Sequence, residues 1–149
     1  MKRTWRLAAF LGAFALLAVH TAANAQATVS RPLKMAAESQ QTINLGNGAV
    51  SARARGVATH LGSFTADGSG NLADPVNFGT LSAANGDEVY YEGNTATGAY
   101  AITGGTGRFK GAGGVFVITV QMMGQPVIHP ENGTMTIELR WTASGTIIY

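Results

Sequence analysis

The sequence predicts an all-β fold in one small domain, and composition and periodicity both lead to this expectation. The chain has 149 residues, of which 20 are glycine and only 12% are charged. Glycine is costly inside helices and useful in tight turns, so its abundance disfavours an all-α bundle. From Thr42 onward, short β-like runs are separated by turn residues at intervals of about ten residues, which is typical of an all-β barrel or sandwich.

Residues 1–25 have the pattern of a signal peptide. Three basic residues lie within the first six positions, an apolar stretch runs from Leu7 to Val19, and small residues from Ala23 to Ala25 provide a cleavage site. The apolar stretch is shorter than the roughly 20 residues that a membrane-spanning helix needs. We therefore expect cleavage after Ala25 and an exported protein that is periplasmic or extracellular.

Removal of this segment also removes the basic excess of the chain. The whole sequence has 10 Lys and Arg residues against 8 Asp and Glu residues, and residues 1–25 contain three of the basic residues and none of the acidic ones. Seven basic and eight acidic residues remain, a formal net charge of −1, so we expect no nucleic-acid partner. Because the chain has no cysteine, its stability must come from the core or from association rather than from disulfides.

The elements are expected in the following order. Residues 26–41 show no clean strand period and contain Pro32, so we expect a flexible lead-in before a β-barrel domain over residues 42–149. Eight runs are predicted as strands: 49–60, 62–65, 76–83, 88–92, 98–103, 115–123, 135–142 and 146–149. Turn residues separate several of them, at 67–71, 84–87, 104–107 and 131–133, and Asn-Gly pairs at 85–86 and 132–133 are the strongest hairpin signals.

Side-chain alternation is clearest in the run 135–142. Met135, Ile137, Leu139 and Trp141 share one face and the residues between them are polar, so this strand has an apolar and a polar side. The segment 115–120 is instead apolar on both faces, which is expected for a strand that is covered on both sides or packed against another subunit. The two apolar faces of the segment 115–120 favour an oligomer.

A glycine-rich turn carries the most specific pattern. In the segment 101–112, AITGGTGRFKGA, the glycines Gly104, Gly105 and Gly107 can adopt positive φ angles and Phe109 can pack beside the bend. A phosphate-binding loop would need a Lys-Ser/Thr pair and a following helical pattern, which the sequence lacks. The segment resembles the strand, glycine turn and following strand of plant allene oxide cyclases and dirigent proteins, and the segments 57–64 and 83–87 resemble parts of bacterial exported proteins with this barrel type.

This resemblance implies an eight-stranded antiparallel barrel, commonly a trimer, whose interior holds a small apolar molecule and which needs no cofactor. The plant enzymes guide the cyclisation of a fatty-acid epoxide or the coupling of phenoxy radicals, largely by confining the reactants and excluding water. Their cavity residues lie on other strands, so the resemblance assigns no catalytic residue to this chain.

The usual residues for metal binding and nucleophilic catalysis are scarce. After residue 25 the histidines are His60 and His129, and neither lies in a metal-ligand pattern such as His-x-x-x-His. A Ser-His-Asp hydrolase is not expected either, because the chain has no Gly-x-Ser-x-Gly motif. We therefore expect no metal site.

Polar residues that alternate along predicted strands are the candidates for lining a barrel cavity. They are Arg53, Arg55, Glu88, Tyr90, Glu92, Glu138 and Arg140. If their faces line the lumen, the charges can orient a ligand carboxylate or act as general acid and base. If the same faces meet water, they are solvated charges and ion pairs of little energetic weight. A register shift of one residue exchanges the two faces, so both interpretations stay open.

Three functions remain compatible with the sequence. The best supported is an exported barrel that binds a small hydrophobic molecule in its interior. The first alternative is a cofactor-independent cyclase or isomerase, or a dirigent-like enzyme. The second is a small outer-membrane barrel, because Trp141 and Tyr149 belong to one face near the C-terminus. Lipid-spanning strands, however, need about ten residues with a continuous apolar outer band, and several runs here are shorter.

Overall fold

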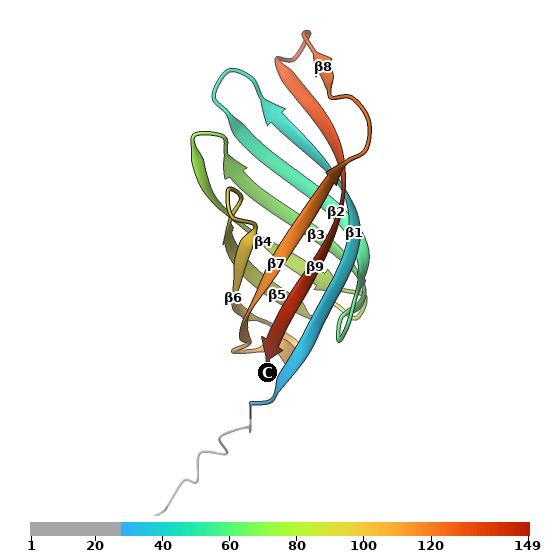
Figure 1. The fold of residues 1–149 in the computed structure, drawn as a ribbon, viewed down its shortest axis with the longest axis vertical. Helices are drawn as coiled ribbons and strands as arrows, with labels where there is room; N and C mark the ends of the chain where they lie inside the picture. The colour runs from blue at the N-terminus through green and yellow to red at the C-terminus, as the bar shows by residue number, and fades with distance from the viewer. Residues whose placement is uncertain (1–27) are drawn as a thin grey trace, which may run out of the picture.

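A computed structural model describes residues 28–149 and shows a closed antiparallel β-barrel (Figure 1). The strands are β1 (Ser30–Asn44), β2 (Ala49–Ala58), β3 (Gly62–Asn71), β4 (Asp74–Ala83), β5 (Glu88–Asn94), β6 (Ala99–Gly105), β7 (Gly113–Met122), β8 (Val127–His129) and β9 (Thr134–Ile148), with a 3-10 turn, η1 (Gly107–Phe109), before β7. Strands β1 to β7 pair in sequence order, β9 pairs with β7, and β9 pairs with β1 to close the ring. The short β8 pairs with the start of β9. The prediction of an eight-stranded antiparallel barrel is confirmed.

The predicted signal peptide, residues 1–25, lies outside the described residues. Its cleavage site lies there too, so the expectation of export rests on the sequence. Within residues 28–149, no helix is long and apolar enough to cross a lipid bilayer.

Strand β1 shows that the prediction of a flexible lead-in over residues 26–41 is wrong for residues 30–41, while residues 26 and 27 lie outside the described residues. Leu33, Met35 and Ala37 face inward and are 1%, 4% and 6% exposed, while the residues between them face outward. β1 pairs with β2 on one side and along its whole length with β9 on the other, so it is the strand that closes the barrel. Pro32 is tolerated because it lies near the start of the strand, where its missing N–H removes little of the ladder.

Two further predicted breaks are absent. The runs predicted at 135–142 and 146–149 form one strand, β9, and the turn predicted at 67–71 is the second half of β3. Close packing explains both differences. A Cβ atom at Gly145 would collide with the carbonyl oxygen of Val115, and one at Gly68 would lie 2.9 Å from the hydroxyl of Tyr91. These glycines therefore mark close approaches inside strands rather than turns.

The end of the barrel near the C-terminus is closed by packed side chains. The turn η1 directs Phe109 inward, where it is fully buried and packs edge-to-face against Tyr149 with ring centroids 5.0 Å apart. Gly104 and Gly107 have φ angles of 156° and 55°, which favour glycine. A Cβ atom at Gly107 would also collide with the carboxylate of Asp87. The predicted packing of Phe109 beside the glycine turn is confirmed.

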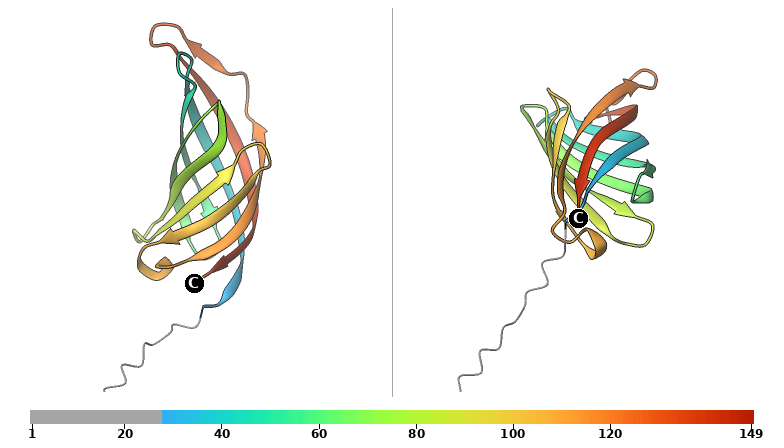
Figure 2. Two further views of the ribbon diagram at one scale, coloured as in Figure 1. Left: turned by 90° about the vertical axis from the view of Figure 1, so that its left-hand side faces the viewer. Right: turned by 60° about the horizontal axis from the view of Figure 1, so that its bottom comes forward.

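The opposite end of the barrel is open on one side. β5 and β6 have 7 residues each, whereas β1 and β9 have 15. The wall is therefore lower at β5 and β6, and the pair β8–β9 projects beyond the other strands (Figures 1 and 2). Val120, which lines the lumen, is consequently 54% exposed. The lumen meets solvent at this end.

Candidate ligand-binding site in the lumen

The lumen contains a cavity of about 90 Å³ on the open side of the packed core. Apolar side chains make up most of its wall, among them Met35, Leu81, Phe116 and Trp141. Small residues on β2 and β3 create the space, because Ala52, Ala54 and Ala66 reach only a short way toward the barrel axis. The polar groups that line it include Asn77 of β4, Tyr91 of β5 and Tyr100 of β6.

Asn77 is the polar residue that the fold leaves unsatisfied. Its Nδ2 atom donates a hydrogen bond to the Tyr100 hydroxyl at 3.3 Å, while its Oδ1 atom is buried without a partner. A buried acceptor without a hydrogen bond destabilises a fold by about 1–3 kcal/mol. Exchanging the amide oxygen and nitrogen would still leave one polar atom unpaired, because Tyr100 is the single partner of this amide. A molecule in the cavity that donates a hydrogen bond removes this penalty.

Tyr91 presents a second polar group to the same space. Its ring packs edge-on against the rings of Tyr100 and Phe116, with centroids 5.8 and 6.2 Å away. Its hydroxyl lies over Gly79, where any side chain would collide with it. Burial raises the pKa of Tyr91 to about 12, with smaller contributions from Tyr100 and Asp67. The phenol is therefore a neutral hydrogen-bond donor at ordinary pH.

The residues predicted from the sequence as cavity candidates all lie on the outer face. They are Arg53, Arg55, Glu88, Tyr90, Glu92, Glu138 and Arg140, and none of them lines the lumen cavity. On β2, for example, Arg53 and Arg55 alternate with Ala54, which lines the cavity. Alternation places the small and apolar neighbours inside. The structure therefore places these seven residues on the barrel surface, which is the second of the two interpretations that the sequence left open.

Several of these surface groups are brought together in pairs. The pairs are Arg53 with Asp67 at 3.4 Å, Arg140 with Glu38 at 2.8 Å, and the Tyr90 hydroxyl, which donates to the Glu88 carboxylate at 2.9 Å. Exposed ion pairs of this kind contribute about 0–1 kcal/mol each. Arg55, Glu92 and Glu138 form no salt bridge within residues 28–149.

The sequence contains a signal for Asn77 that a search for motifs does not reveal. Within the predicted run 76–83, Asn77 shares its face with Leu81 and Ala83, which are 2% and 5% exposed. A lone amide on an otherwise apolar strand face indicates an inward polar group. Tyr91 and Tyr100 are visible in the sequence as aromatic residues, but only the register brings the Tyr100 hydroxyl to Asn77 and places Tyr91 at the same cavity.

The outer face also bears on the outer-membrane alternative. Exposed charged side chains lie in the middle of neighbouring strands, as shown by Glu38 on β1, Arg55 on β2 and Arg140 on β9. A lipid-spanning barrel needs a continuous apolar outer band, and an arginine at the bilayer midplane costs about 2–4 kcal/mol. The described exterior therefore counts against this alternative.

The two histidines among residues 28–149 lie at the ends of the barrel. His60 is in the turn between β2 and β3, with its Nε2 atom 2.9 Å from the carbonyl oxygen of Pro32. His129 is on β8, with its Nδ1 atom 3.6 Å from the Glu131 carboxylate. In the part of the chain that the structure describes, no group of three His, Cys, Asp or Glu residues is placed to hold a metal ion.

Comparison with known proteins gives no family for this chain. No protein-family model, no curated protein and no solved structure matches it. The resemblance of the segment 101–112 to allene oxide cyclases and dirigent proteins therefore stays a prediction. The function is therefore inferred from the residues that line the lumen cavity.

Proposed function

We propose that the protein is an exported binding protein that holds a small, largely apolar molecule with a hydrogen-bond donor inside its barrel. The observation that carries this proposal is the unpaired Oδ1 atom of Asn77, a residue that lines a cavity whose wall is mostly apolar and aromatic, with Ser39 and Gln41 as further polar members. Buried polar atoms almost always have a partner, so an unpaired one needs an explanation, and a ligand donor supplies it. The signal-peptide pattern of residues 1–25 supports export.

The size of the cavity limits which part of the ligand is buried. A volume of about 90 Å³ corresponds to about three water molecules in the liquid, so only a small polar head fits beside Asn77. Ile118, Val120 and Leu139 line the same cavity, and Val120 is 54% exposed, so a longer apolar part extends past them into the open end of the barrel. The proposed ligand is therefore elongated, with a hydroxyl or amide group at its inner end.

The groups in the lumen support binding more than catalysis. No carboxylate, histidine or lysine is among the described residues that line the cavity. Tyr91, with a pKa of about 12, is a hydrogen-bond donor and a poor general base near neutral pH. A cyclase or dirigent-like enzyme with this lumen would have to rely on confinement and on donation by Tyr91 to developing negative charge.

Ligand retention by the native chain and by an Asn77→Leu variant tests the proposal. The mature chain is purified without detergent from the exported fraction of its own cell and examined by native mass spectrometry. We expect a discrete small-molecule adduct on the native chain and its loss from Asn77→Leu, because leucine has the same branched arrangement of heavy atoms as asparagine but no donor or acceptor. Gln121→Leu, on the exposed outer face of β7, is the matched control and should keep the adduct.

Unfolding of the ligand-free proteins gives a second readout for the same pair of variants. Asn77→Leu removes the unpaired buried atom but also the donor to the Tyr100 hydroxyl, so without ligand we expect its stability to differ from that of the native chain by less than about 1 kcal/mol. A native chain without any adduct, or an Asn77→Leu variant that retains the adduct, contradicts binding in the lumen. Conversion of the identified ligand to a cyclised product, lost in Tyr91→Phe, would instead support the enzymatic alternative.

A further inference from the structure

One half of the barrel exterior carries an apolar patch, which we call the β4–β7 face. It comprises Phe78, Ala99, Ala101, Val115 and Val117, and its large members Phe78, Val115 and Val117 are 60%, 61% and 53% exposed. Ala99 and Ala101 lie directly opposite Val117 and Val115 in the pairing of β6 with β7. Clusters of exposed apolar side chains on a protein surface mark interaction sites more often than isolated ones do.

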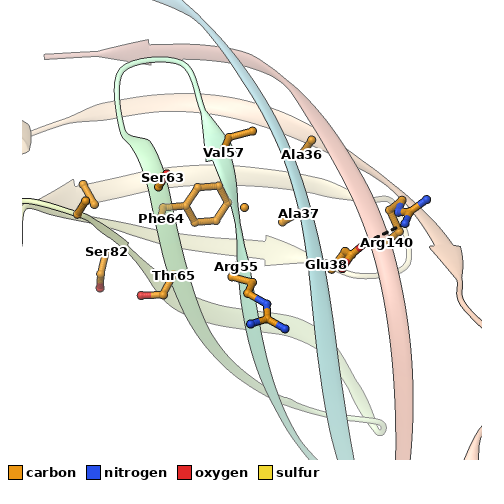
Figure 3. A pocket seen from close by; sticks show the side chains of 13 residues that line it. Ala36, Ala37, Glu38, Arg55, Val57, Ser63, Phe64, Thr65, Ser82 and Arg140 are labelled. Carbon is orange, nitrogen blue, oxygen red and sulfur yellow. Dashed lines mark hydrogen bonds and ion pairs between the residues drawn. The ribbon is translucent and has the colours of Figure 1, made fainter.

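The other half of the exterior contains a groove of about 750 Å³ over β1, β2, β3 and the end of β4 (Figure 3). Ala36 and Val57 lie on one side of the groove, and Arg55 and the ion pair of Glu38 with Arg140 lie on the other. The volume is within the range of about 300–1,000 Å³ that is typical of binding sites. The groove therefore offers an apolar wall facing a cationic one.

Each of the two surfaces carries a charged residue that forms no salt bridge within residues 28–149. Arg55, at the groove, forms no salt bridge within residues 28–149. Glu92 on β5 lies opposite Phe78 on β4 and Ala101 on β6, so it stands inside the β4–β7 face, and it also forms no salt bridge in this part of the chain. Glu38 lies opposite Arg55 in the pairing of β1 with β2, but its carboxylate is held by Arg140 at 2.8 Å, so the Arg55 guanidinium is left to complement the Glu92 carboxylate of another copy.

We infer that copies of this chain associate head to tail, with the β4–β7 face of one copy seated in the groove of the next. Phe78 packs against Ala36 and Val57 of the neighbouring copy, and Glu92 pairs with its Arg55. The contact removes exposed apolar side chains from water and pairs both charges. Because the two surfaces differ, the contact is heterologous and repeats into a closed ring or an open chain. It does not depend on a ligand in the lumen.

Charge reversal and charge exchange test this contact. Sedimentation velocity over a concentration series gives the dissociation constant of the mature chain. We expect the native chain to associate, and Arg55→Glu and Glu92→Arg each to raise the dissociation constant by about tenfold or more, because each opposes like charges. The double variant Arg55→Glu/Glu92→Arg restores the pair with its signs exchanged and should return close to native association. Lys110→Glu has the same change in net charge as Arg55→Glu, lies outside both surfaces, and should leave association unchanged.

A Phe78→Ser variant tests the apolar part of the contact. Phe78 is exposed in the single barrel, so the variant should keep the thermal unfolding of the native chain while it loses association. The inference is overturned by a native chain that sediments as a monomer at its highest accessible concentration. It is equally overturned if Phe78→Ser associates normally or if the double variant stays as weak as the single ones. Association of Asn77→Leu as strongly as the native chain separates this contact from the lumen site.

Discussion

Single residues decide which polar groups the lumen of this barrel contains. Tyr91 reaches the cavity because Gly79 leaves the position of its hydroxyl empty, and its ring is held by the stacked pair of Tyr100 and Phe116, whose centroids are 5.3 Å apart. Asn77 is anchored through one of its two polar atoms only. An amide and a phenol therefore stand at fixed positions in the wall of the cavity, and such pre-positioned groups give a binding site its orientation and specificity.

Tyr91 also makes the stability of the protein change with pH in the alkaline range. Its pKa is raised from the ordinary value of 10.0 to about 12 in the folded chain, chiefly by burial. Between these two pH values the unfolded state releases the phenolic proton while the folded state keeps it, so the free energy of unfolding falls as pH rises. The slope is about 1.4 kcal/mol per pH unit inside this window. We expect Tyr91→Phe to remove this contribution, as measured by urea unfolding at about pH 9 and about pH 11.

Tyr90 provides the comparison for this experiment. It occupies the preceding position on β5 but faces outward, and the hydrogen bond to the Glu88 carboxylate raises its pKa. Solvent screens this exposed pair, so Tyr90→Phe should change the pH dependence less than Tyr91→Phe does. Equal slopes for the native chain and Tyr91→Phe would contradict a buried phenol.

At the scale of the elements, glycines inside strands allow neighbouring strands to approach closely. A Cβ atom at Gly145 of β9 would meet the carbonyl oxygen of Val115 and lie 2.8 Å from the Cβ atom of Phe116 on β7. Backbone atoms cannot move aside as the end of a flexible side chain can. The pairing of β7 with β9 therefore depends on the absence of a side chain at this position.

Gly145→Ala and Gly113→Ala are expected to change stability in opposite directions. Gly145→Ala should destabilise the barrel by about 1–3 kcal/mol, because it overpacks the contact between β7 and β9. At Gly113, at the start of β7, an added Cβ atom would have no neighbouring atom within 4 Å, and the φ angle is not positive. Gly113→Ala should therefore stabilise the protein by about 0.4–1 kcal/mol, because alanine lowers the conformational entropy of the unfolded chain. Urea unfolding measures both changes, and a destabilisation of equal size in the two variants would contradict the steric argument.

For the molecule as a whole, closure of the barrel depends on its first strand. β1 pairs with β2 and β9, and without it both of these strands become unpaired edges that invite aggregation. Closure also gives the barrel an inner face, which lines the apolar lumen, and a separate outer face, which carries both surfaces of the proposed contact between copies. Ligand binding in the lumen and the proposed contact between copies therefore both require the complete ring of strands.

Deletion of residues 26–41 tests this dependence. It removes most of β1, including Leu33, Met35 and Ala37 of the core. We expect the shortened chain to lose cooperative thermal unfolding, as followed by circular dichroism, and to aggregate. Deletion of residues 26–28, which precede β1, is the control and should leave the melting curve unchanged. A shortened chain that still melts cooperatively would restore the interpretation of this segment as a lead-in.

The number of barrel strands predicted from the sequence is correct only because two errors offset each other, and the short β8 outside the ring was not predicted. β1 escapes prediction, since its inward side includes the small Ala37 and the polar Ser39 and Gln41 and so lacks a continuous apolar period. β9 is divided in two by the prediction, since Gly145 resembles a turn residue when its partner strand is unknown. Both errors have one physical cause. Whether a small or polar residue belongs to a strand depends on the neighbouring strand that packs against it, and the sequence does not show that neighbour.

The sequence by itself determined the all-β class, the hairpins at Asn85-Gly86 and Asn132-Gly133, and the packing of Phe109 beside its glycine turn. These features depend on neighbours along the chain, where glycine conformations and strand alternation act locally. Gly86 and Gly133 indeed have φ angles of 87° and 65°.

Only the tertiary structure decided which strand faces point inward and which polar residues meet in the lumen. Asn77, Tyr91 and Tyr100 belong to three strands, and pairing register brings them together. A shift of one residue would have placed Arg53 and Arg55 inside instead, because every side chain changes face with each step along a strand. Register follows from the packing of the whole barrel, since burial of the apolar faces of all strands at once selects one alignment.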